Sequence, residues 1–175
     1  MRNTAFLAIG IGLLVLQSNL FRLIGRFQIS GATPSLLLPL VVFMGVHEYS
    51  IARGAALAFL LGYLLDLFSA APIGLFTFIT VATFVVARAA GVRLAAQTLL
   101  TKAFLALVFA LLEGILIIVL TAIFSTDTAR PRALASLVIP HAIGTALFAP
   151  FIFNLAERVH QATITAPRPG EGAQR

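Results

Sequence analysis

Two acidic side chains fall inside long apolar runs of the sequence, and their chemistry is the most informative in the chain. Asp66 follows the run GYLL, and Glu113 lies midway along the longest apolar run. A carboxyl group is costly to place in a bilayer, so it faces protein or water and marks a functional or architectural position. Neither residue has a Lys or Arg one helical turn away on its own segment. A hydrogen bond to an adjacent helix and a neutral, protonated carboxyl both stay open, beside a role in partner binding or transport.

The remaining reactive side chains form no catalytic or ligating pattern. The sequence contains no Cys and no HExxH, GxSxG or Walker-type GxxxxGK[ST] motif. His47, His141 and His160 lie on three separate segments, without the one-turn spacing that places two imidazoles on one helix face. We therefore predict a protein that is not an enzyme and has no catalytic, cofactor-binding or metal site. We interpret His141 as a structural histidine near a neighbouring helix or the interface rather than as a proton relay.

The composition indicates the environment of these residues. Hydrophobic residues make up 60% of the 175 residues and charged residues only 10%, whereas an ordinary soluble domain carries roughly 25% charged residues. With a mean hydropathy of +1.04, the chain cannot form the charged surface of a soluble enzyme, and it is too apolar to be disordered. The net charge of +6 fits cytoplasmic loops beside anionic lipid better than it fits nucleic acid. The composition predicts an integral membrane protein.

Continuous apolar runs without strand-like alternation predict an all-α integral membrane protein with six transmembrane helices in one bundle. The predicted spans are residues 6–21, 34–49, 51–68, 72–90, 99–124 and 134–155. The second is expected to be the shortest or most bent, because Pro39 should kink it near residues 35–39. We assign residues 1–160 to the transmembrane domain and the Pro- and Gly-rich residues 161–175 to a flexible cytoplasmic tail.

The distribution of Lys and Arg predicts the orientation in the membrane, because cytoplasmic loops carry the excess of basic residues. With six spans and a cytoplasmic N-terminus, the side facing away from the cytoplasm holds only Arg22, Arg26, Arg130 and Arg132. The cytoplasmic side holds Arg2, Arg53, Arg88, Arg93, Lys102, Arg158, Arg168 and Arg175. Both termini are therefore predicted to be cytoplasmic.

Small residues repeat at four-residue spacing beside both acids. The two ladders are Ser50, Gly54, Ala58, Gly62 and Asp66, and Ala106, Ala110 and Gly114. Small side chains at this spacing let helix backbones approach closely, which is the main source of helix association in lipid. Gly74, which follows the first ladder, is expected to let the chain pack closely against Gly62 or a neighbouring helix.

Asp66 lies near the C-terminal end of its predicted helix, where the helix macrodipole disfavours a negative charge. The short link SAAPIG returns the chain beside it, with Pro72 predicted at the first position of the next helix. The unpaired amides of that helix would then lie at the same membrane depth. We predict that Asp66 accepts hydrogen bonds from the amides around residues 73–76, from Ser69 or from the Thr77 hydroxyl.

Several of these residues also belong to motifs that resemble a known family. The segments are PSLLLPLVVF (34–43), GYLLD (62–66) with the SAAPIG link (69–74), and the closing stretch APFIFNLAERV (149–159). In this order they resemble the MreD family of bacterial rod shape-determining membrane proteins. The resemblance implies a fold similar to the six-helix substrate-binding subunit of energy-coupling-factor transporters.

The resemblance also implies a function and partners. It implies a non-enzymatic scaffold of the bacterial cell-elongation machinery, in the inner membrane, that regulates cell shape during lateral peptidoglycan synthesis. Its direct partner would be MreC, a single-span membrane protein with a periplasmic domain. MreB filaments, a SEDS glycosyltransferase and a penicillin-binding transpeptidase would associate indirectly. The candidate partner-binding or architectural residues are Gly62, Asp66, Pro72, Gly74, Glu113 and Gly114.

A second function class stays open, a vitamin-binding membrane subunit of an energy-coupling-factor transporter. Such a subunit needs polar and aromatic side chains converging on an outward pocket. The chain has no Trp and two Tyr, and Gln17, Asn19, Asp66 and Glu113 are the polar residues expected to line such a pocket. An intramembrane enzyme is disfavoured because no nucleophile–base pair is visible.

Overall fold

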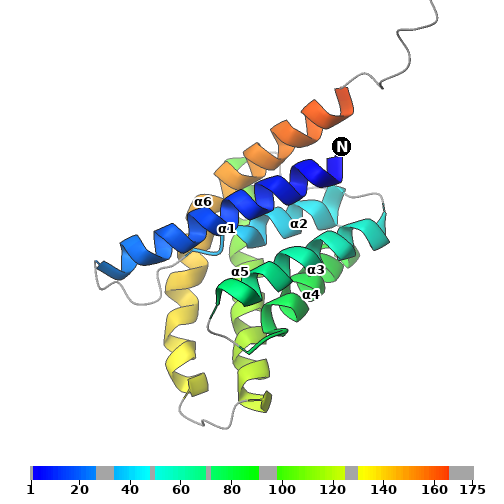
Figure 1. Ribbon diagram of the computed structural model, residues 1–175. Coiled ribbons are helices and arrows are strands. Elements are labelled where there is room, and N and C mark those ends of the chain that lie inside the picture. Colours follow the sequence, from blue (N-terminus) through cyan, green and yellow to red (C-terminus); the bar gives the residue numbers. More distant parts are fainter. Residues whose placement is uncertain are drawn as a thin grey trace, which may run out of the picture.

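A computed structural model describes residues 2–26, 34–47, 50–69, 72–90, 98–124 and 130–165. These residues form six helices and no strand (Figure 1): α1 (Arg2–Arg26), α2 (Leu37–His47), α3 (Ile51–Phe68), α4 (Leu75–Ala89), α5 (Leu99–Phe124) and α6 (Arg130–Thr165). The predicted all-α fold class is confirmed, and each predicted span corresponds to one helix.

Among the described residues, three helices are long and apolar enough to cross a membrane. They are α3, α5 and the part of α6 between Leu134 and Thr163. A bilayer core of roughly 30 Å needs about 20 helical residues, and the apolar stretches of α1, α2 and α4 are shorter. Large apolar side chains also point outward, such as Phe104 and Ile123, each 66% exposed. These features are those of a helical membrane protein, while six complete crossings stay a prediction.

Helix α2 lies at the centre of the bundle, where it contacts every other helix. It is the shortest helix, as predicted, and every residue from 34 to 45 is buried. A helix that is apolar all round is stable only when it is surrounded. The predicted kink at Pro39 is not supported, because the helix begins at Leu37. Pro39 therefore falls in the first turn, where its missing N–H breaks no helical hydrogen bond.

Side chains of two other helices hold the segment that leads into α2. The Ser35 amide donates to Thr145 Oγ1 of α6 at 2.9 Å, and the Leu36 amide donates to Gln17 Oε1 of α1 at 3.0 Å. These bonds satisfy backbone donors that would otherwise be buried without a partner. They fix the start of the central helix between α1 and α6.

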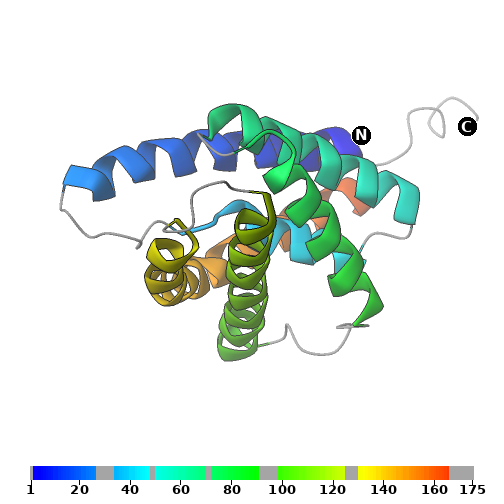
Figure 2. The ribbon, with the colours of Figure 1, turned by 90° about the horizontal axis from the view of Figure 1, so that it is seen from below.

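Helix α6 has two parts that run in different directions. Its first part packs along α5, and its second part continues beside α1 (Figure 1, yellow and orange; Figure 2 shows the same arrangement from below). Pro140 and Pro150 lie inside the helix, and each removes a backbone donor and crowds the preceding turn. The helix continues to Thr165, so residues 161–165 of the predicted tail are helical. Residues 166–175 lie outside the described residues.

Candidate functional site

Asp66 closes the hairpin between α3 and α4 by accepting four hydrogen bonds. Its Oδ2 accepts from the amides of Gly74 and Thr77, both at 3.0 Å, and from Thr77 Oγ1 at 2.5 Å. Its Oδ1 accepts from the Phe76 amide at 2.8 Å. The side chain is 2% exposed. The predicted capture of Asp66 by the start of the following helix is confirmed for the backbone amides and the Thr77 hydroxyl.

Ser69 contributes differently from the prediction. Its hydroxyl and its amide both donate to the backbone carbonyl of Asp66, at 3.2 and 3.3 Å, rather than to the carboxyl group. These bonds cap the C-terminal end of α3. The carboxyl group therefore reaches past the end of its own helix to the positive end of α4.

The roles predicted for Pro72 and Gly74 need correction. Helix α4 begins at Leu75, so Pro72 precedes it, and the Pro72 carbonyl accepts from the Leu75 amide at 3.2 Å. Gly74 has a φ of +97°, and no atom lies within 4 Å of the position that a Cβ would take. Its function is to adopt a left-handed conformation that directs its amide to Asp66, and it makes no close contact with Gly62.

Helices α3 and α4 approach each other closely at Gly62. A Cβ at Gly62 would lie 2.7 Å from Thr77 Cα and 2.9 Å from the Phe76 carbonyl oxygen. One turn earlier, the Ala58 carbonyl accepts from Thr80 Oγ1 at 3.0 Å. From Gly54 to Asp66, every member of the predicted ladder is buried, as close helix packing requires.

Glu113 is buried between α5 and α6 and is 4% exposed, which confirms that it faces the helix bundle rather than lipid. Its Oε2 lies 3.6 Å from His141 Nε2, a separation that suits an ion pair with a protonated imidazole but exceeds a hydrogen bond. A Cβ at Gly114 would lie 2.6 Å from Val138 Cγ1, so Gly114 allows the two helices to approach closely here. Unlike Asp66, Glu113 Oε2 has no hydrogen-bond donor among the described residues.

A cleft of about 660 Å³ opens in front of Glu113. Its polar lining comes from five parts of the chain that are far apart in sequence: Gln17, Ser18, Arg22, Ser35, Ser69, Glu113 and His141. Most of its remaining wall is aliphatic or aromatic, and Gly114 also lines it. The cleft lies beside the second halves of α1, α3 and α5 and the first parts of α4 and α6, toward the side predicted to face away from the cytoplasm.

Two of the four polar residues predicted for a pocket line this cleft. These two are Gln17 and Glu113. The carboxyl group of Asp66 is instead bonded within its own hairpin. The side-chain amide of Asn19 donates to the Val15 carbonyl of its own helix at 2.8 Å. His141 was not expected beside Glu113. Glu113 and His141 lie at equal sequence distances before and after the middle of the α5–α6 connection. Two antiparallel helices joined by a short connection bring such positions side by side, so the sequence does contain a signal for this contact.

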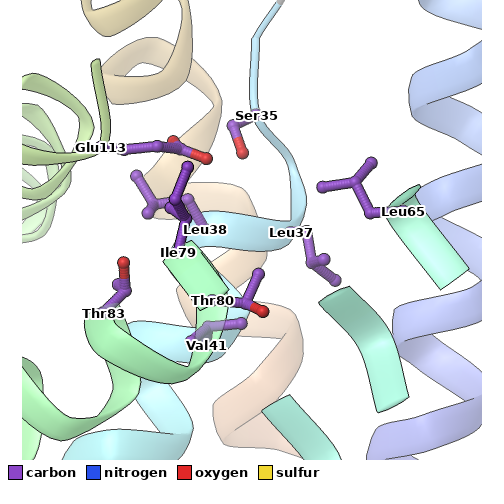
Figure 3. A pocket seen from close by; sticks show the side chains of 9 residues that line it. All are labelled: Ser35, Leu37, Leu38, Val41, Leu65, Ile79, Thr80, Thr83 and Glu113. Atoms are coloured by element: carbon purple, nitrogen blue, oxygen red, sulfur yellow. The ribbon is translucent and has the colours of Figure 1, made fainter. Parts of the chain in front are cut away.

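Beneath the cleft lies an interior gap that has no room for a water molecule. Figure 3 shows Glu113 reaching from α5 toward Ser35, with the aliphatic residues Leu38 and Ile79 below them. Thr83, also on its wall, is fully buried. Ser35 and Glu113 line both the gap and the cleft, so they form the polar boundary between the open space and the packed core.

A second polar contact joins α5 and α6 at a distance from the cleft. Lys102 Nζ donates to Asn154 Oδ1 at 2.6 Å and to Glu157 Oε2 at 3.3 Å. Lys102 is buried, whereas half of the Glu157 side chain is exposed. The charge pattern predicts Lys102 on the cytoplasmic side, but no spacing in the sequence indicates these two partners on α6.

The structure also brings together two histidines that the sequence analysis left apart. The rings of His47 and His160 are 5.7 Å apart between centroids, and Phe43 stacks on His47 at 4.1 Å. Within the described ranges, no group of three His, Cys, Asp or Glu residues could hold a metal ion.

No family model, curated protein or solved structure matches the chain. Its function is therefore inferred from the sequence motifs and from the geometry of the hairpin and the cleft.

Proposed function

We propose that this chain is a non-enzymatic membrane scaffold of the bacterial cell-elongation machinery, as its resemblance to the MreD family implies. It would reside in the inner membrane and bind a single-span protein of the MreC type, which links it indirectly to MreB filaments and the peptidoglycan-synthesising enzymes. The observation that carries the proposal is the α3–α4 hairpin closed by Asp66. The residues that resemble the MreD family motifs form that hairpin and the central helix α2 beside it.

The hairpin has the properties of a docking element for a partner. Four hydrogen bonds to one carboxyl group hold its two helices at a fixed angle. Its end presents large apolar side chains, with Ile73 80% and Phe68 65% exposed. A rigid apolar projection loses little conformational freedom on binding, so it can bind a hydrophobic partner segment at low entropic cost.

Co-purification with the host's MreC-type protein tests this proposal. Asp66→Ala should reduce recovery of the partner because the hairpin loses its clamp, and Ile73→Ser should reduce it without touching the clamp. Glu157→Gln, a change at a half-exposed carboxylate on another helix, serves as the matched control. Full recovery of the partner with both hairpin variants would contradict the docking role.

Depletion of the protein in its host gives an independent test at the cellular level. A scaffold of lateral wall synthesis should leave swollen or rounded cells when it is lost, with no requirement for a particular nutrient. Unchanged cell width together with a vitamin requirement would refute the scaffold and favour the transporter subunit. The cleft of about 660 Å³ supports this second candidate, because its volume falls in the range of small-molecule sites. A vitamin retained through purification would identify it.

The orientation of the hairpin decides whether a periplasmic partner can reach it. An alkaline phosphatase fused to the C-terminus should be inactive, because this enzyme needs the periplasm and both termini are proposed to be cytoplasmic. An active fusion would place the hairpin end on the cytoplasmic side and exclude a periplasmic partner there.

A further inference from the structure

Glu113 combines three features of a ligand-binding group. It is buried, it lines an open cleft, and its Oε2 has no hydrogen-bond donor among the described residues. A buried carboxylate oxygen without a donor is unfavourable, because it has lost water without gaining a hydrogen bond. We propose that the cleft binds a small, largely apolar molecule bearing a primary amine, whose N–H groups donate to Glu113.

The shape and lining of the cleft favour an amphipathic molecule. Its apolar wall comes from five helices and includes Leu14, Phe68, Phe76, Ile117 and Leu137. A volume of about 660 Å³ accommodates an apolar body of drug-like size. The polar end of such a molecule would meet Glu113 at the inner boundary, while its apolar part contacts the walls.

The charge and hydrogen-bonding of the inner boundary favour an amine over an anion or an alcohol. Among the described residues, the cleft lining holds one acidic side chain, Glu113, and one Arg side chain, Arg22 of α1, so repulsion of an anion applies to the part of the cleft beside Glu113. Gln17 Oε1 already accepts from the Leu36 amide, which leaves the carboxylate as the stronger acceptor for a ligand. An ammonium group both neutralises the carboxylate and fills its acceptor sites, as charge-assisted hydrogen bonds require. His141, at 3.6 Å, lies close enough to contact the same nitrogen.

This amine could come from two sources, a soluble molecule or the head group of an aminophospholipid. The inference rests on the cleft alone, so its failure would leave the hairpin proposal and its co-purification test unaffected. Four probes separate the possibilities: decylamine, decyltrimethylammonium with the same charge but no N–H, decanol with the same chain but no charge, and nanodiscs with or without phosphatidylethanolamine.

The experiment measures the midpoint of thermal unfolding of the full chain in phosphatidylcholine nanodiscs. Decylamine should raise the midpoint more than decyltrimethylammonium or decanol does. In the Glu113→Gln variant, a roughly tenfold higher decylamine concentration should be needed for the same rise in the midpoint. In the Glu157→Gln variant, the concentration needed should be unchanged. Leu137→Trp, which fills the cleft and keeps the carboxylate, should abolish the effect. If the source is lipid, phosphatidylethanolamine nanodiscs should give the higher midpoint before any probe is added, and decylamine should add nothing further.

Two results would overturn the inference. Equal shifts with decylamine and decyltrimethylammonium would show that N–H donation to the carboxylate does not matter. A full decylamine shift in both Glu113→Gln and Leu137→Trp would place the amine elsewhere, in the bilayer or on the surface of the bundle.

Discussion

Asp66 and Glu113 are both acids buried in apolar helices, yet their surroundings differ completely. Asp66 accepts three backbone amides and a hydroxyl from the start of α4. Glu113 faces His141 at 3.6 Å and an open cleft. Both oxygens of the first carboxylate are engaged by donors of its own fold, whereas the second carboxylate keeps an oxygen for a partner. Burial alone therefore does not tell whether an acid in a membrane helix has a structural role or a ligand-binding role. The number of hydrogen-bond donors around its carboxyl group separates the two roles.

The physical origin of the difference is the position of each acid along its helix. Asp66 lies in the last turn of α3, so a short connection brings the free amides of the next helix to it. Glu113 lies in the middle of α5, where the backbone amides of its own helix are bonded within the helix, and the amide of the nearby Ser35 already donates to Thr145 Oγ1. Only side chains or a ligand can supply donors there.

Asp66→Ala should cause the largest loss of stability. It leaves three amides and the Thr77 hydroxyl without their acceptor, and removing one side of such a buried charged contact costs about 3–5 kcal/mol. Unfolding of the purified protein by SDS in mixed micelles measures this loss. Ser69→Ala, which removes the hydroxyl bond to the Asp66 carbonyl and leaves the carboxyl group in place, is the matched control and should cost about 1 kcal/mol. Similar losses in the two variants would show that the carboxyl group is not the clamp.

Gly62→Ala should be the next most disruptive change, because its new Cβ would meet the backbone of α4. Thr77 Cα and the Phe76 carbonyl cannot move without shifting the helix, and such overpacking costs about 1–3 kcal/mol. Gly114→Ala should cost less, because its Cβ would meet the side chain of Val138 rather than the backbone of the neighbouring helix. The same unfolding assay compares the two, and a larger loss at Gly114 would contradict the assignment of the tighter contact to α3 and α4.

Gly74→Ala tests the left-handed turn alone. A Cβ there would meet no atom, so the cost comes from the backbone conformation and should be about 1 kcal/mol. Gly74→Asn should cost less than Gly74→Ala, because Asn tolerates this conformation better. If Ala is as stable as Gly, the positive φ is not required to hold the amide against Asp66.

The sequence predicted the hairpin better than it predicted the cleft, for physical reasons. The partners of Asp66 lie within eleven positions of it along the chain, so helix-end rules applied to one short link found them. The cleft joins residues from Gln17 to His141, which only the packing of α1, α5 and α6 brings together. Pro72 and Gly74 were assigned the wrong roles because the start of α4 was placed three residues early. Helix boundaries are the least certain part of a sequence pattern.

The same chemical change at both acids gives the most direct comparison, and the change at Glu113 has the smallest expected effect. Asp66→Asn keeps one acceptor oxygen but turns an NH₂ group toward an amide donor, so it should cost about 2 kcal/mol. Glu113→Gln breaks no hydrogen bond at Oε2 and removes a buried charge. The free energy of unfolding of this variant should therefore differ from that of the unchanged protein by less than about 1 kcal/mol. Unfolding in the same micelles measures both variants. A loss at Glu113 as large as that at Asp66 would mean that the carboxylate of Glu113 is also part of the architecture, held by His141 as an ion pair rather than left available to a ligand.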